Sequence, residues 1–129
     1  MSNNKKSKIF MDKAKLKKRV YIFALKILKL IDSLPNKKPY WSLGDQLLRA
    51  GTSIEANIIE AQAASSKKEF VRFYHIALKS ANETKFWLSL LKDSGKIDKK
   101  IIEPILKEAI ELSNILAASI LTMKNKKKI

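Results

Sequence analysis

A line of cations that could hold phosphate groups recurs at helical spacing in residues 68–79. It consists of Lys68, Arg72, His75 and Lys79, which follow one another at intervals of four, three and four residues. Residues at this spacing share one face of a helix, where lysines act as point charges and an arginine can fork onto two phosphate oxygens. The sequence therefore yields five candidate nucleic-acid-binding residues, namely Arg49, Lys67, Lys68, Arg72 and Lys79.

The same line of cations has a second interpretation. Helices of water-soluble proteins carry charged residues on the face opposite their core, so a lysine-rich solvated face produces this pattern without any ligand. His75 is the single histidine of the chain, and we interpret it as a surface residue rather than a catalyst. The placement of the cations in the fold must distinguish the two interpretations.

Other chemistry is poorly represented in the sequence. Ser53 and Asn57 lie four residues apart in an apolar segment, which predicts a structural hydrogen-bond network rather than an active site. The acidic residues Glu60, Glu69 and Glu83 lack the Glu-x-x-His pairs of helical-bundle metal sites, and the chain contains no cysteine. We therefore expect no catalytic residues, no metal and no cofactor.

The charge balance favours an acidic partner. The chain has 129 residues with 27 Lys plus Arg against 12 Asp plus Glu, for a formal net charge of +15. Residues 5–19 contribute +7 and residues 124–128 contribute +4, which leaves +4 for residues 20–123. The chain lacks an uncharged stretch of the length that spans a membrane, and we expect a cytoplasmic protein. An anionic membrane surface bound through residues 5–31 ranks lowest as a partner, because the apolar stripe there is needed by the core.

Sparse proline and glycine residues divide the chain into four long segments that favour helix. We expect helices at about 11–34, 42–62, 66–94 and 98–123. Ser42 is the expected N-cap of the second helix, and Ser66 with Glu69 forms a capping box for the third. Gly95 supplies the left-handed C-terminal conformation, Asp98 caps the fourth helix, and Pro104 predicts a kink or a later start there.

Apolar residues repeat along each segment with the period of an amphipathic helix. Four such helices with short connections predict an all-α fold, an antiparallel up-down-up-down four-helix bundle. The expected organisation is a flexible basic tail at 1–10, the bundle domain at 11–123 and a basic C-terminal tail at 124–129. The expected core residues are Leu16, Val20, Phe23, Ile27, Ile31, Leu34, Leu43, Leu47, Ala50, Ile54, Ile58, Ala61, Phe70, Phe73, Ala77, Ala81, Thr84, Leu88, Leu91, Ile105, Ala109, Leu112, Leu116, Ile120 and Met123.

Several of these helices carry apolar residues on a second face, away from the expected core. Scattered exposed apolar residues are common, but their repetition on three helices favours a homo-oligomer in which bundles pack side by side. The predicted oligomer interface consists of Ile22, Leu25, Phe86, Leu90, Ile110 and Leu121.

Three stretches carry a recognisable pattern: residues 47–61 (LLRAGTSIEANIIEA), 66–73 (SKKEFVRF) and 76–83 (IALKSANE). Together they resemble the bacterial 23S rRNA intervening-sequence protein family. The family pattern Arg-Ala, Ser-Ile-x-x-Asn-Ile-x-Glu and Ser-Lys-x-Glu-Phe is matched in order. The sequence departs from it at Glu55 and Ala61, where proline and glycine are common, and its residues 86–88 (FWL) are similar to the accessory variability proteins of diversity-generating retroelements.

The resemblance implies an antiparallel four-helix bundle that assembles as a pentamer with a basic surface. Relatives in retroelements bind nucleic acid and partner a reverse transcriptase. We therefore expect a non-enzymatic, oligomeric nucleic-acid-binding protein, with structured RNA favoured, that uses its basic surface and tails as a sequence-tolerant phosphate footprint. The alternative is a protein-interaction scaffold or an accessory subunit, for example of a retroelement reverse transcriptase.

Overall fold

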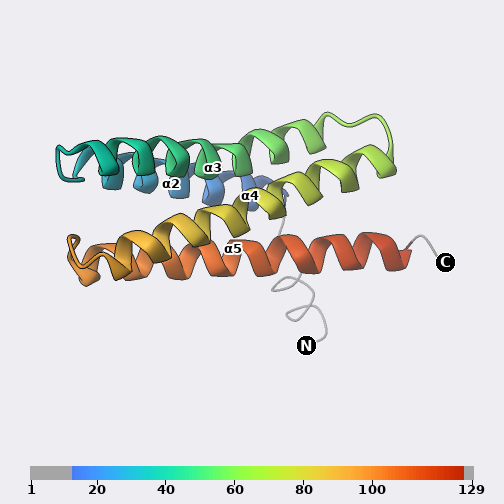
Figure 1. The fold of residues 1–129 in the computed structure, drawn as a ribbon. Coiled ribbons are helices and arrows are strands. Elements are labelled where there is room, and N and C mark those ends of the chain that lie inside the picture. The colour runs from blue at the N-terminus through green and yellow to red at the C-terminus, as the bar shows by residue number, and fades with distance from the viewer. Residues whose placement is uncertain (1–12, 127–129) are drawn as a thin grey trace.

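The computed structural model describes residues 13–126, so the expected tail at 1–10 and the last residues of the tail at 124–129 lie outside the described part. The described chain forms four helices: α2 (Lys13–Asp32), α3 (Lys38–Gln62), α4 (Lys67–Asp93) and α5 (Lys99–Lys126). Figure 1 shows that the chain reverses direction at each connection. Each helix contacts the helices before and after it, and α2 also contacts α5, which closes an antiparallel four-helix bundle. The predicted fold class is confirmed.

The helix ends follow the capping chemistry expected from the sequence. The Ser66 hydroxyl accepts a hydrogen bond from the Glu69 amide at 3.1 Å, and the Asp98 carboxylate accepts from the Lys100 amide at 2.9 Å. Each bond satisfies a first-turn amide that has no partner inside its helix. Gly95 has a φ of 72°, a conformation that a Cβ atom disfavours, and it ends the α4 segment as predicted.

Two expected helix starts are wrong. The second helix begins at Lys38 rather than after Ser42, because Pro39 has a helical φ and needs no amide partner in the first turn. The amides of Tyr40 and Trp41 already bond to the carbonyl of Lys37. At Pro104, where the sequence predicts a kink or a later start, the later start is wrong: α5 begins at Lys99, directly after the predicted cap Asp98, and includes this proline.

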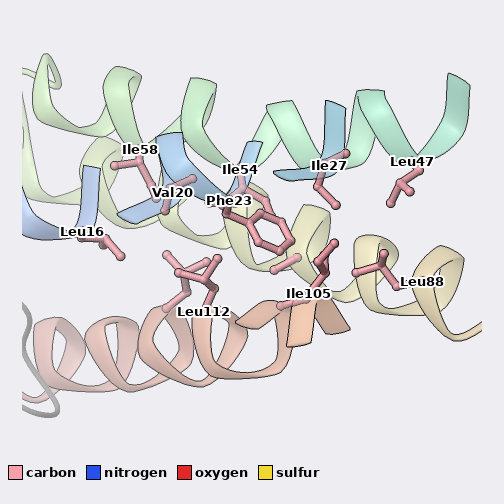
Figure 2. Packing of buried hydrophobic residues seen from close by; sticks show 14 of the residues in the cluster. Leu16, Val20, Phe23, Ile27, Leu47, Ile54, Ile58, Leu88, Ile105 and Leu112 are labelled. Atoms are coloured by element: carbon pink, nitrogen blue, oxygen red, sulfur yellow. The ribbon is translucent and has the colours of Figure 1, made fainter. Parts of the chain in front are cut away.

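The core lies between the four helices and contains the predicted apolar stripes. Figure 2 shows Phe23, Ile54, Leu88 and Leu112, one from each helix, pointing into this space, and all four are 0% exposed. The details differ near the helix ends. Ile31, Leu34, Leu43, Phe70, Phe73 and Met123 are only partly buried, whereas Leu30, Tyr74 and Ile102 are buried although they were not expected to be.

A polar layer fixes how α3 and α4 lie against each other. The Ser80 hydroxyl donates a hydrogen bond to the Ser53 hydroxyl at 2.9 Å. The side-chain amide of Asn57 donates to the backbone carbonyl of Ser53 at 2.8 Å and to the Ser53 hydroxyl at 3.1 Å. The predicted structural network around Ser53 and Asn57 therefore exists. Small side chains let the two helices make the most extensive contact in the bundle, and the bond between Ser53 and Ser80 defines their register.

Candidate nucleic-acid interface

The predicted line of cations lies on the outer face of α4. Lys68, Arg72, His75 and Lys79 are all exposed, whereas Ala77 on the other side of the helix is 0% exposed. At 1.5 Å per residue, the line from Lys68 to Lys79 is about 17 Å long. It therefore forms a continuous basic strip along the first half of α4.

Arg72 is held in place by a neighbouring ring rather than by a carboxylate. Its guanidinium carbon lies 4.6 Å from the ring centroid of Phe73, in a cation–π contact. Such a contact covers the flat face of the guanidinium and leaves its N–H edge available for a phosphate. Among the described residues, the ion pairs involve Arg19 and Lys92 as cations, so neither Arg72 nor the lysines of the line are neutralised in this way.

The fold brings further cations to the start of this line. Lys67 and Lys68 begin α4, and together with Val71, Met123 and Lys124 they line a cavity of about 100 Å³. Lys124 belongs to the last turns of α5, so the beginning of α4 and the end of α5 meet here. Lys13, at the start of α2, places its ammonium nitrogen 4.8 Å from the ring centroid of Phe70.

We call the cluster formed by Lys13, Lys67, Lys68, Arg72 and Lys124 the basic end. All five side chains are exposed, and none takes part in an ion pair among residues 13–126. The sequence analysis did not identify Lys13 or Lys124 as partners of Lys67 and Lys68. The signal was available, because in an up-down-up-down bundle the first helix starts on the side where the second connection lies and the fourth helix ends. Figure 1 shows the α3–α4 connection and the end of α5 at one end of the bundle, with the start of α2 set back from it.

Arg49 lies apart from the basic end. Since Ser53 of α3 bonds to Ser80 of α4 and the two helices are antiparallel, Arg49 lies about level with Thr84. Thr84 is sixteen residues beyond Lys68, which corresponds to about 24 Å along the bundle. Arg49 and Lys79 therefore belong to the middle of the α3–α4 surface, and only Lys67, Lys68 and Arg72 of the five predicted residues join the basic end.

The positive charge of Arg19 is neutralised by carboxylates within the bundle. Its side chain donates to both carboxylate oxygens of Glu108 at 2.7 Å and to Glu111 at 2.5 Å, which links α2 to α5. The hydrogen bond to Glu108 raises the pKa of Arg19 more than its partial burial lowers it. Part of the positive charge that the sequence places in residues 5–19 is therefore structural.

The acidic residues of the bundle do not form a metal site. Within residues 13–126, no three His, Asp or Glu side chains gather in a way that could hold a metal ion. Burial raises the pKa of Glu55, and the charge of Lys17 partly offsets that increase. Burial also raises the pKa of the Tyr74 hydroxyl.

The six residues predicted for an oligomer interface are all exposed in the single chain. They fall on two separate surfaces: Ile22 and Leu25 lie on α2, whereas Phe86, Leu90, Ile110 and Leu121 lie on α4 and α5. Tyr21 and Leu28 extend the first surface, at 54% and 51% exposed, and the sequence analysis missed both. Because α2 lies diagonally across the bundle from α4, the two surfaces face different directions.

Comparisons with known proteins agree with this architecture. The model of the 23S rRNA-intervening sequence protein family matches residues 12–118. A solved protein of unknown function from the S23 ribosomal protein family of Bacteroides thetaiotaomicron is 37% identical, with a TM-score of 0.78 over 85% of this chain and 98% of that one. No protein with a curated description matches the chain significantly. In the described part of the chain, helices long and apolar enough to cross a membrane are absent.

Proposed function

Because the chain belongs to the 23S rRNA-intervening sequence protein family, we propose that it is a non-enzymatic homo-oligomer that binds nucleic acid, with RNA favoured. The observation that carries this proposal is the basic end. Exposed cations from the start of α2, the start of α4 and the end of α5 gather there without ion-pair partners in the described structure. A surface of this kind attracts the phosphates of a nucleic-acid backbone and is indifferent to base sequence.

The chain adjoining the basic end strengthens this electrostatic argument. By sequence, residues 1–12 contain Lys5, Lys6 and Lys8, and residues 127–129 contain Lys127 and Lys128. These segments are joined to α2 and α5 at the basic end. In the sequence, these basic segments adjoin the helices that contribute Lys13 and Lys124 to the basic end, which supports an electrostatic attraction of phosphate.

The non-enzymatic part of the proposal rests on residue types. The chain has one histidine and no cysteine, and His75 is exposed on the basic line, where no side chain of residues 13–126 hydrogen-bonds to it to orient it as a base. General acid–base or nucleophilic catalysis needs a positioned pair of groups with matched pKa values. We also propose a cytoplasmic location, which suits a cysteine-free RNA-binding protein.

A salt titration tests nucleic-acid binding directly. The full-length chain is titrated into a fluorescently labelled RNA hairpin, and the affinity is followed by anisotropy from low to high salt. Five phosphate contacts at the basic end would make the logarithm of the association constant fall with the logarithm of salt concentration with a slope of about −4.5. A flat salt dependence, or no binding at low salt, would contradict the proposed function.

The oligomeric part of the proposal follows from the two separate apolar surfaces. A twofold dimer uses one surface twice, whereas two different surfaces facing different directions allow head-to-tail contacts that close into a ring. The family resemblance suggests five subunits. Light scattering is expected to give a multiple of the 14.7 kDa chain mass, and a mass of one chain would contradict the prediction.

Matched variants locate the contact. Phe86→Glu is expected to lower the mass of the assembly, because it places a charge on the α4–α5 surface. Trp41→Glu is the control, since Trp41 is exposed to the same degree, 56% against 57% for Phe86, but belongs to neither surface. Equal masses for the two variants would argue against the α4–α5 surface.

A second candidate function is that of an accessory subunit for another protein, for example a reverse transcriptase. The exposed apolar residues on α2, α4 and α5 favour this candidate, because they provide protein-binding area that the basic end does not. Co-purification of the chain with a reverse transcriptase encoded beside its gene, in nuclease-treated extract, would support the accessory role. Loss of every partner on nuclease treatment would support nucleic-acid binding instead.

A further inference from the structure

The aromatic rings near the basic end are occupied by contacts within the protein, namely ring stacking, cation–π contacts and packing against the core. Phe70 and Tyr74 stack on each other with centroids 4.5 Å apart and an interplanar angle of 25°. Lys13 lies over the ring of Phe70, and Arg72 lies over the ring of Phe73. Tyr74 is only 4% exposed, and both phenylalanines are partly buried against the core. These rings are therefore not free to stack with a base.

The exposed aromatic residues of the described chain lie elsewhere. Trp41 and Phe86 are 56% and 57% exposed, but Trp41 lies in the first turns of α3, at the opposite end of the bundle. Phe86 follows Lys67 by nineteen residues, which is about 28 Å along α4. Tyr21, at 54% exposed, lies about 12 Å along α2 from Lys13, the residue whose ammonium group reaches Phe70 of α4.

The cavity that the described residues form at the basic end is too small for an unstacked base. Its cavity, lined by Lys67, Lys68 and Lys124 with Val71 and Met123, has a volume of only about 100 Å³. Pockets that enclose small organic ligands measure about 300–1,000 Å³. The chemistry that remains at the basic end is the charge and hydrogen-bonding capacity of lysine and arginine.

We infer that the basic end binds paired, double-helical nucleic acid in preference to single strands, an inference that rests on the proposed function. A double helix stacks its own bases and presents the phosphates of both strands on its outside. Cationic side chains on the protein are therefore sufficient to bind it. A flexible single strand exposes its bases, and its binding proteins offer aromatic rings along a basic groove to stack them. Within residues 13–126, the rings at the basic end are covered by Lys13, Arg72 and the core, and for the same number of cations a duplex releases more counterions.

The test compares two probes of the same length and base composition. The full-length chain is titrated by anisotropy with a labelled RNA duplex and with a labelled unpaired RNA, at the same salt concentrations. The duplex is expected to bind at least about 10-fold more tightly, with a salt slope of about −0.9 per phosphate contact against about −0.7 for the single strand. Equal affinity, or tighter binding of the single strand, overturns the inference while the proposed function stands. Failure of both probes to bind overturns the proposed function as well.

A variant of Tyr21 separates the two faces of the bundle. Among the described residues, Tyr21 is the exposed ring nearest to the lysines of α2, so a single strand that stacks on this part of the protein would use it. Because Tyr21 also extends the apolar surface of α2, light scattering first establishes that Tyr21→Ala keeps the assembly mass of the natural chain. At equal mass, the variant is expected to change neither probe's affinity by more than about 2-fold. If the variant loses single-strand affinity at least about 10-fold while duplex affinity is unchanged, α2 is a stacking site and the inference is wrong.

Discussion

The sharpest test of the interface is the removal of three charges from the outer line of α4. The variant Lys68→Gln, Arg72→Gln and Lys79→Gln replaces three exposed cations that form no ion pair in the described chain. Glutamine has nearly the same helix propensity as lysine and arginine, so the substitutions remove charge without weakening the helix much. The three positions span about 17 Å of one helix face, which lets them contact the same stretch of backbone.

The expected loss of affinity follows from counterion release. Each phosphate contact on a double helix adds about 0.9 to the slope of log affinity against log salt, so three lost contacts reduce the slope by about 2.7. If this contribution vanishes near 1 M salt, each contact is worth a factor of about 5 at about 0.15 M. The triple variant should therefore bind roughly 100-fold more weakly than the natural chain at physiological salt, and about equally near 1 M salt.

Stability is measured in parallel, because Arg72 also contacts Phe73. Loss of this exposed cation–π contact is expected to cost about 0.5–1 kcal/mol. The melting temperature, followed by circular dichroism, should therefore fall by a few degrees at most. The fold should be intact at the temperature of the binding assay, so that a loss of affinity reports on the charges alone.

A matched control removes the same charge from the other end of the bundle. Lys96, Lys99 and Lys100 are exposed at the connection between α4 and α5, and their replacement by glutamine changes the net charge equally. This control is expected to bind within about 3-fold of the natural chain, because screening limits charge effects to about 10 Å. Equal losses in both variants would refute a localised interface, and an unchanged triple variant would shift binding to residues outside the line.

Three further predictions concern stability. Burial raises the pKa of Glu55 above its usual 4.5, so the charged carboxylate destabilises the folded state at pH 7. Glu55→Gln should therefore raise the melting temperature at pH 7. This gain should disappear below about pH 4.5, where the carboxyl group is protonated in the folded and the unfolded chain. A constant gain at all pH values would contradict the assigned cause. Gly95→Ala should lower the unfolding free energy in urea by about 1 kcal/mol through its φ of 72° alone, since a Cβ there would meet no atom within 4 Å; an unchanged value would be evidence against conformational strain. Ser80→Ala removes the 2.9 Å hydrogen bond to Ser53 and should cost about 1 kcal/mol in the same assay, with a neutral effect telling against the polar layer.

Much of the fold could be predicted because its determinants are local. The apolar period identifies the buried face of each helix, and Ser66, Gly95 and Asp98 mark helix ends through bonds to residues close in sequence. Predictions failed where two local signals compete. At Ser42 a good capping side chain lies inside a helix that Pro39 had already begun, and at Pro104 the rest of α5 maintains the helix around a proline.

The candidate site was less predictable because it depends on which helices are neighbours. Helical spacing identifies the line on α4, but it does not reveal that Lys13 and Lys124 come from the two chain ends to join it. Nor does it reveal that Arg49 is displaced along the bundle, which depends on the register defined by Ser53 and Ser80. Arg19 is a similar case, because its carboxylate partners are 89 and 92 residues away in sequence.

The two side-chain connections across the bundle also predict an order of folding. Ser53 and Ser80 are 27 residues apart, whereas Arg19 and Glu108 are 89 apart, so closing the second loop costs about 1 kcal/mol more chain entropy. We expect the α3–α4 hairpin to condense early and the α2–α5 edge to close late, so that changes at Ser80 slow folding and changes at Arg19 accelerate unfolding. During synthesis α2 leaves the ribosome first, yet the partners of Arg19 become available only when α5 has emerged.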